Sequence, residues 1–157
     1  MHKTSEAVES AAGVPVLHIA DAAAERIKSA GLGRIGLLGT LFTMEEDFYK
    51  ERLITKHGLE VVLPSREDRQ VVHRIIYEEL CQGIVAESSR VEYVRIMERM
   101  REEGAQGAIL GCTEIGLLVG QKDVDLPLFD TTVIHAEWAA DWALQGEAGS
   151  EHHITTV

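Results

Sequence analysis

The feature that most constrains this chain is an alternation of short apolar runs with longer amphipathic stretches. Short runs rich in Val, Ile and Leu are typical of buried strands, and they lie at residues 14–19, 35–38, 59–63, 107–111 and 126–129. The stretches between them place apolar residues at helical spacing. Strands that alternate with helices predict an α/β fold, in which helices flank both faces of a parallel sheet.

Caps and breakers set the expected helix bounds. Helices are predicted over residues 21–27, 44–56, 66–80 and 131–144, with a further helix that begins at Ser88 or Ser89. Ser65 is an expected N-cap, because its side chain can accept from a free first-turn amide. Gly83 is expected to end the helix that Ser65 starts. The polar tail over residues 145–157 is expected to be flexible.

Charge and composition exclude several classes of partner. The 157 residues carry 15 Lys and Arg against 26 Asp and Glu, a formal charge of −11, so a nucleic-acid partner is not expected. No apolar run approaches the roughly 20 residues that span a bilayer, and the polar start of the chain is unlike a secretory signal. The two cysteines, far apart in sequence, predict free thiols in a reducing, cytoplasmic setting.

In open parallel sheets, ligands bind beyond the carboxyl ends of the strands. Cys112 follows a predicted strand and a glycine, and it is the strongest single candidate for chemistry. If a helix begins there, its free amides would lower the pKa of the thiol. The alternative is a small buried residue at a strand end. Cys81 lies at the end of a predicted helix, and core packing is its expected role.

Three threonines also follow the predicted strands. Thr40, Thr43 and Thr113 could hold a substrate carboxylate together with free amides, although each could instead cap a helix or turn. His135, one turn into the last helix, is a weaker candidate. The seven histidines show no metal-ligand spacing, so no metal is expected. No glycine-rich phosphate loop occurs, so no nucleotide site is predicted.

Three segments resemble the aspartate/glutamate racemase superfamily, specifically its aspartate racemase branch. They are residues 35–49 (IGLLGTLFTMEEDFY), 76–81 (IYEELC) and 110–118 (LGCTEIGLL), and the resemblance extends over nearly the whole chain. The glutamate racemase branch typically has His where this chain has Glu114. The dipeptide that follows Ile134, His135-Ala136, also fits the aspartate branch.

The resemblance implies a two-lobed α/β enzyme that inverts amino-acid Cα centres, aspartate being the expected substrate, without pyridoxal phosphate or any other cofactor. Two cysteines would face each other across the substrate, one as base and one as acid. Cys112 matches the cysteine of the second lobe. Thr113 matches the neighbouring residue that holds the substrate carboxylate, and Thr40, Thr43, Glu114 and His135 are the other expected substrate contacts.

The chain departs from the family pattern at its start. The family's first cysteine lies in a Cys-Asn-Thr-Met-His-Lys stretch, and this chain begins at Met1-His2-Lys3, so an N-terminal truncation is expected. Residues 1–33 are then a remnant of the first lobe (helix, strand, helix), residues 34–144 are a Rossmann-like second lobe, and residues 145–157 are a flexible tail.

Two consequences follow from that interpretation. One thiol cannot serve both faces of a Cα, so the chain alone is expected to be a poor racemase. An unpaired apolar strand at residues 14–19 would favour a homo-oligomer. The alternatives are a non-catalytic truncated lobe and a one-cysteine, decarboxylase-like or proton-exchange enzyme.

Overall fold

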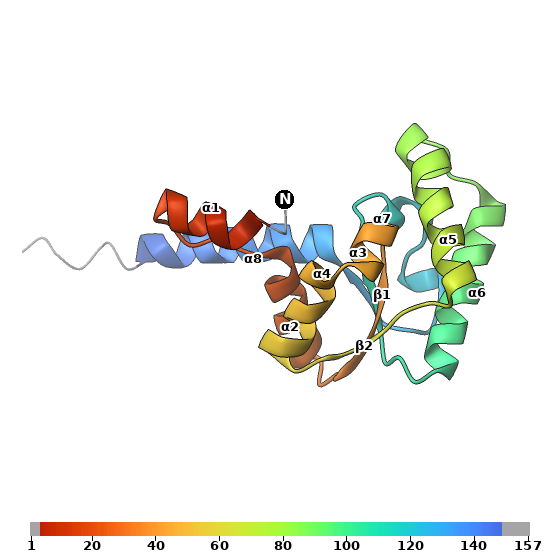
Figure 1. Cartoon of the computed structure of the whole chain (residues 1–157), viewed down its shortest axis with the longest axis horizontal. Coiled ribbons are helices and arrows are strands. Elements are labelled where there is room, and N and C mark those ends of the chain that lie inside the picture. Colours follow the sequence, from red (N-terminus) through yellow and green to blue (C-terminus); the bar gives the residue numbers. More distant parts are fainter. Residues whose placement is uncertain (1–3, 149–157) are drawn as a thin grey trace, which may run out of the picture.

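A four-stranded parallel sheet organises the protein, whose computed structural model describes residues 4–148 (Figure 1). The strand order is β2-β1-β3-β4, so β1 and β3 occupy the centre. The strands are β1 (Arg34–Leu38), β2 (Glu60–Val62), β3 (Ala108–Leu110) and β4 (Leu128–Asp130). The parallel register pairs Leu38 with Leu110, which brings the carboxyl ends of both central strands to one edge.

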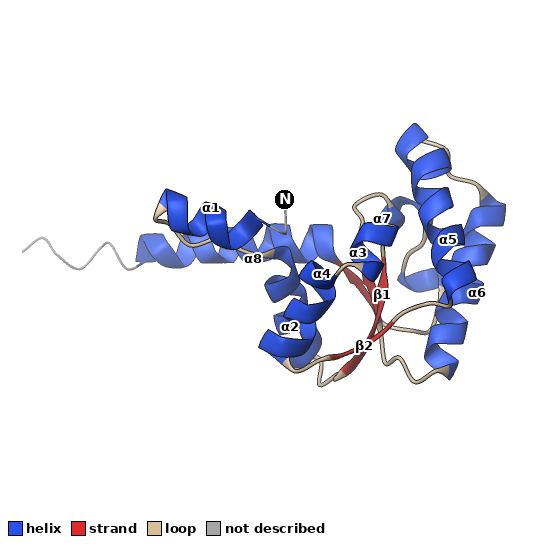
Figure 2. Ribbon diagram, in the orientation of Figure 1, coloured by secondary structure: helices blue, strands red, loops and turns tan. Residues whose placement is uncertain are grey.

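Helices cover both faces of the sheet, as Figure 2 shows. On one face lie α2 (Ile19–Ser29), α4 (Asp47–Glu51) and α8 (Thr131–Ala148). On the other lie α5 (Arg66–Arg74) and α6 (Glu87–Glu102). Each face has its own apolar core: Ile27 and Leu53 pack in the first, and Val72 and Met97 in the second. The α/β fold with a helix-flanked parallel sheet is therefore confirmed.

Four of the five predicted strands are present, each within two residues of its expected start. Ser65 caps α5 as predicted, because its Oγ accepts from the amide of Asp68 at 3.1 Å. Gly83 ends the turn Leu80–Gln82, further along the predicted helix. Its φ is 75°, a left-handed conformation that glycine adopts without strain.

The predicted strand over residues 14–19 is wrong. Residues 14–18 form a connector from α1 (Ser5–Ala12) to α2 that lies outside the sheet. A strand needs a hydrogen-bonded neighbour, and the described sheet ends at β2 and β4 instead. His18 caps α2, since its Nδ1 accepts from the amide of Ala20 at 3.1 Å, and Ile19 therefore begins the helix.

Two predicted helices are interrupted. The predicted helix over residues 44–56 divides into α3 (Leu41–Glu45), α4 and a π-helical turn, because Glu46 adopts extended backbone between α3 and α4. The helix that starts at Arg66 likewise continues after α5 as a π-helical turn, Ile75–Glu79. The spacing of apolar residues alone does not reveal these local breaks.

The last helix runs further than predicted. Residues 145–148 of the expected flexible tail belong to α8, and residues 149–157 lie outside the described part of the chain. The proposed division at residue 33 stays a prediction. α2, on the N-terminal side of that division, packs in one core with Ile35 and Leu37 of β1.

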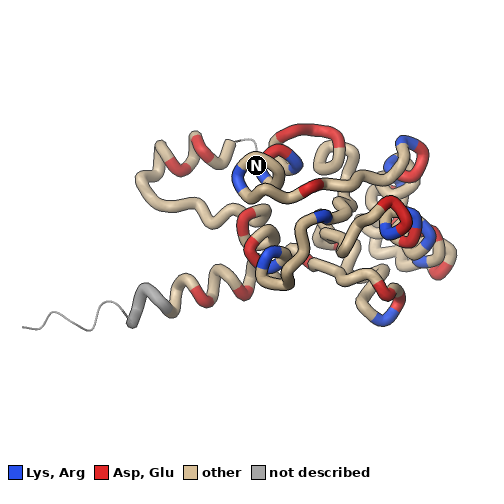
Figure 3. Tube along the Cα trace, turned by 90° about the horizontal axis from the view of Figure 1, so that it is seen from below, with Lys and Arg blue, Asp and Glu red and all other residues tan. Residues whose placement is uncertain are grey.

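Charged residues of both signs lie together on α5 and α6, at the right of Figure 3, whereas α1 and α8 at the left carry no Lys or Arg. On α6 they form ion pairs three residues apart, between Arg90 and Glu87 at 2.6 Å and between Arg95 and Glu92 at 2.8 Å. Exposed pairs of this kind each contribute well under about 1 kcal/mol. Within residues 4–148, no helix combines the length and apolar character that crossing a bilayer requires.

A charge cluster around Asp21 ties α2 to the π-helical turn Arg52–Lys56. The buried carboxylate accepts from Arg52 at 2.7 and 2.8 Å, from Lys56 at 2.6 Å and from His57 at 2.8 Å. Burial alone would raise the pKa of Asp21, but the hydrogen bonds from these three side chains outweigh burial and hold that pKa well below its usual range. The cluster therefore stabilises the fold through the charged carboxylate.

We expect Asp21→Asn to lower the free energy of unfolding at pH 7 by about 2 kcal/mol, because it removes the charged acceptor of the hydrogen bonds from Arg52 and Lys56. Since the pKa of Asp21 is depressed in the folded state, the wild-type advantage is present above the unfolded pKa of about 3.9 and is lost as pH falls below it. Urea denaturation between pH 3 and pH 7 (a range spanning that pKa) measures the difference. The exposed Asp125→Asn is the control, and an equal loss in both variants would contradict the account.

Candidate active site

The carboxyl edge of the sheet brings together the loops that follow β1 and β3. The amide of Gly111 donates to the carbonyl of Leu38 at 2.7 Å, which extends the pairing of the two strands by one residue. Beyond that bond, the chain from β1 turns into α3 through Thr40, and the chain from β3 turns towards α7 (Ile115–Leu118) through Cys112. The two loops named from the sequence therefore lie side by side.

Close contact between the loops depends on the absence of a side chain at Gly111. A Cβ at this position would lie 2.8 Å from the Leu38 carbonyl oxygen and 3.3 Å from both the Leu37 side chain and Cγ2 of Thr43. The first contact is with backbone of the central strand, so it cannot be relieved by a side-chain rotation.

We expect Gly111→Ala to lower the free energy of unfolding by about 1–3 kcal/mol, the usual cost of an extra methyl group in a packed site. Gly33→Ala is a matched control at the opposite edge of the sheet, because a Cβ there meets nothing within 4 Å. Chemical denaturation of both variants measures the effect. Equal stability of the two variants would show that the contact at Gly111 is not restrictive.

Cys112 is half-buried in the turn between β3 and α7. Its Sγ lies 2.8 Å from Oε2 of Glu114, with the thiol as donor and the carboxylate as acceptor. Burial raises the pKa of Cys112, and the adjacent Glu114 carboxylate raises it further, to about 12. The same hydrogen bond, together with one from Thr113, lowers the pKa of Glu114. The resting pair is therefore a neutral thiol beside a charged carboxylate.

The helix start on which a lowered pKa of Cys112 depended does not lie at this residue, and the one backbone hydrogen bond that lowers the pKa, from the Glu114 amide, is outweighed by burial and by the Glu114 carboxylate. α7 begins at Ile115, three residues beyond the cysteine, and it spans a single turn. The thiol is directed to the Glu114 carboxylate, and a neighbouring negative charge disfavours the thiolate.

The remaining residues predicted to contact the substrate are three threonines and His135. The hydroxyl groups of Thr40 and Thr43 are 3.2 Å apart, and Thr40 Oγ1 accepts from the amide of Thr43 at 3.3 Å, so Thr40 caps α3. Thr113 is exposed at the same edge as Cys112. Nε2 of His135 contacts the Leu17 carbonyl at 2.8 Å, so this ring joins α8 to the connector before α2.

The core-packing role expected for Cys81 is wrong, because its side chain is exposed. Cys81 lies in a short turn, Leu80–Gln82, that contacts α7. It is close enough to Cys112 to contribute to the raised pKa of that thiol. The apolar stripe ends at the buried Leu80, and Cys81 lies just beyond it in the turn Leu80–Gln82, where helical spacing no longer predicts burial.

Two residues that are not among the predicted site residues hold the Cys112 loop from outside. The buried Thr131 hydroxyl donates to the carbonyl of Leu110 at 2.8 Å, at the end of β3. Arg90 Nε donates to the carbonyl of Leu118 at 2.8 Å, at the end of α7. The position of Thr131, just past a predicted strand, was one signal in the sequence. Arg90 lies on a helix 28 residues from its partner, and no sequence pattern indicated its contact.

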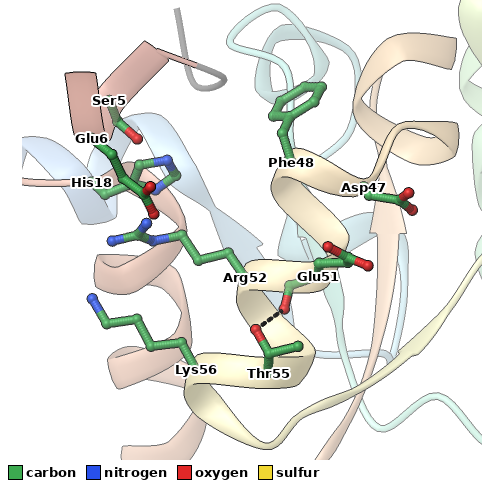
Figure 4. A pocket seen from close by; sticks show the side chains of 9 residues that line it. All are labelled: Ser5, Glu6, His18, Asp47, Phe48, Glu51, Arg52, Thr55 and Lys56. Atoms are coloured by element: carbon green, nitrogen blue, oxygen red, sulfur yellow. Dashed lines mark hydrogen bonds between the residues drawn. The ribbon is translucent and has the colours of Figure 1, made fainter. Parts of the chain in front are cut away.

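A cavity of about 350 Å³ lies elsewhere, lined by α1, His18, α4 and the π-helical turn Arg52–Lys56 (Figure 4). Arg52 and Lys56 extend into it from one side and Glu6 from another, and Phe48 is also part of its lining. None of its lining residues belongs to the two loops at the carboxyl edge. Among residues 4–148, no three His, Cys, Asp or Glu side chains gather in a way that could hold a metal ion.

A parallel sheet flanked by helices on both faces places the protein among the open-sheet α/β proteins, in which ligands bind beyond the carboxyl ends of the strands. The family model for Asp/Glu/hydantoin racemases matches residues 1–139. The chain belongs to this family.

Solved structures agree with that assignment. A candidate Asp/Glu racemase from Yersinia pestis is 56% identical, with a TM-score of 0.89 over 92% of this chain and 63% of its own. An aspartate racemase homologue from Pyrococcus horikoshii OT3 is 39% identical, with a TM-score of 0.82 over 90% of this chain and 62% of its own. The chain thus spans about three fifths of the length of these structures.

A curated relative is 31% identical over 107 residues, which are 68% of this chain and 69% of the relative. It is an uncharacterized protein from the pnlA 3′ region of Pectobacterium carotovorum subsp. carotovorum.

Proposed function

We propose that the protein acts in cofactor-independent racemisation of an amino acid, aspartate being the expected substrate, with Cys112 as an acid/base group at Cα. The observation that carries this proposal is the 2.8 Å hydrogen bond between the Cys112 thiol and the Glu114 carboxylate at the carboxyl edge of the sheet. A thiol paired with a carboxylate can lose its proton to that carboxylate and recover it. Family membership supports racemase chemistry, and the homologue from Pyrococcus horikoshii supports aspartate.

The proposed step transfers two protons, one from the thiol and one from Cα. Glu114 takes the thiol proton, the Cys112 thiolate then takes the α-proton of the substrate, and the C–H electron pair passes to Cα and its carboxylate. Return of a proton from sulfur to Cα reverses the step. We propose that Thr40, Thr43 and Thr113 hold the substrate carboxylate, which draws the negative charge away from Cα. Glu114 is then a base for the thiol, and His135 a residue that positions α8.

The raised pKa predicts slow chemistry by this chain alone. With a pKa of about 12, the fraction of Cys112 in the thiolate form at pH 7 is about 10⁻⁵. Inversion also needs a proton donor on the opposite face of Cα, and Cys112 with Glu114 serves one face. We therefore propose that the chain exchanges the α-proton slowly and inverts Cα poorly, which is the one-cysteine alternative raised by the sequence.

The proposal also covers the oligomeric state of the protein and its cellular compartment. Val8, Val16, Leu17 and Ile19 line a largely apolar hollow between α1 and the start of α2, and contiguous apolar surface of this kind favours association, so we propose a homo-oligomer through this hollow in place of the strand-mediated contact first expected. Both cysteines are free thiols, which supports a reducing, cytoplasmic setting.

Substrate choice can be tested by incubating L-aspartate, L-glutamate and L-alanine separately with the protein in deuterated buffer. Loss of the α-proton NMR signal measures exchange. We expect aspartate to exchange fastest and alanine, which lacks a second carboxylate, at the buffer rate. Equal rates for all three amino acids would contradict the proposed substrate class.

A further inference from the structure

His73 makes a contact at the carboxyl edge that no part of the sequence pattern indicated. Its Nδ1 accepts from the backbone amide of Leu41 at 3.3 Å. Leu41 is the first residue of α3, and first-turn amides have no partner within their own helix. The half-buried imidazole therefore completes, from α5, a turn that begins 32 residues earlier in the chain.

The imidazole also contacts a neighbouring aromatic ring. Val72, the preceding residue, is fully buried in the core, and the ring of His73 packs on Tyr77 with 4.6 Å between centroids. Because Leu41 donates its N–H, Nδ1 is the unprotonated nitrogen and the ring proton lies on Nε2. The Leu41 amide therefore requires a hydrogen-bond acceptor at the position of Nδ1.

The turn held by His73 carries the two threonines proposed to bind the substrate carboxylate. Thr40 immediately precedes Leu41, and Thr43 follows two residues later, hydrogen-bonded to Thr40. Thr43 in turn lies within 3.3 Å of the position that a Cβ on Gly111 would occupy, next to Cys112. A shift of the Leu41 amide would therefore move both hydroxyl groups relative to the cysteine loop.

From these contacts we infer that His73 is a positioning residue, which fixes the Thr40–Thr43 turn for the substrate carboxylate through the amide of Leu41. The inference rests on the proposed function for the identity of the ligand. It does not place His73 in contact with substrate.

Three variants separate this role from general packing. Asparagine places an oxygen the same number of bonds from Cα as Nδ1, so His73→Asn keeps the acceptor. His73→Gln places its amide one bond further away, and His73→Ala removes it. ¹⁵N-labelled protein gives two readouts: hydrogen exchange of the Leu41 amide without ligand, and the affinity for L-aspartate from shifts of the Thr40, Thr43 and Gly111 amides.

We expect the alanine and glutamine variants to lose Leu41 protection and aspartate affinity by roughly tenfold each, the effect of one hydrogen bond, while the asparagine variant keeps both. An unprotected Leu41 amide in the wild type, unchanged affinity in His73→Ala, or equal rescue by Gln and Asn would overturn the inference. If the wild type does not bind aspartate, the proposed function fails, and Leu41 protection alone decides whether His73 holds the turn.

Discussion

Cys112→Ser is expected to reduce α-proton exchange of L-aspartate by about 10³-fold, within the range that a positioned acid/base group contributes. Serine keeps the size and a hydrogen bond to Glu114, but its hydroxyl is a far weaker acid than a thiol, so the α-proton has no acceptor. Loss of the α-proton NMR signal in deuterated buffer measures the rate for both proteins.

Cys81→Ser is the matched control, since it removes the chain's other thiol from an exposed position. We expect exchange in this variant to stay within about twofold of wild type, as for surface substitutions generally. If instead Cys81→Ser abolished exchange and Cys112→Ser did not, Cys112 would be a packing residue and the site would lie elsewhere.

Glu114→Gln is expected to have opposite effects on exchange and on thiol reactivity. Removing the carboxylate removes the acceptor of the thiol proton, and because we expect this loss to outweigh the gain in thiolate fraction, α-proton exchange falls by about 10²-fold. It also removes the negative charge that raises the pKa of Cys112, so that pKa falls towards its ordinary value. Each unit of decrease in the pKa increases the thiolate fraction at pH 8 by about tenfold, and alkylation by iodoacetamide rises accordingly.

The alkylation experiment uses a Cys81→Ser background, so that Cys112 is the only thiol. In that background the rate with Glu114 intact should rise about tenfold per pH unit between pH 7 and pH 10 (below the raised pKa), because the thiol is protonated throughout. A plateau near pH 8 would contradict the raised pKa. A parallel fall in both exchange and alkylation would show that Glu114→Gln simply disrupts the loop.

The strand–helix alternation was enough to predict the parallel sheet, because buried parallel strands are apolar throughout and need no long-range information to recognise. Residues 14–19 have the same composition and still form no strand, since strand formation depends on a neighbour that sequence composition does not reveal. The helix interruption at Glu46 likewise leaves the apolar spacing on either side intact.

Some features of the candidate site could likewise be predicted from the sequence, and others could not. Cys112 and Thr40 could be placed at the carboxyl edge because they follow strands directly. The state of the thiol could not be predicted, because it depends on the direction of the Glu114 side chain and on the late start of α7 at Ile115. His73 was missed because its contact with Leu41 arises only when α5 packs beside α3.

Enantiomer-resolved analysis of L-aspartate, incubated in deuterated buffer with this chain, tests most directly whether one thiol–carboxylate pair on one face of Cα does the chemistry. The account predicts slow deuterium incorporation that requires Cys112, with the labelled aspartate remaining almost entirely L. Formation of D-aspartate as fast as deuterium enters, or incorporation that persists without the Cys112 sulfur, would contradict it.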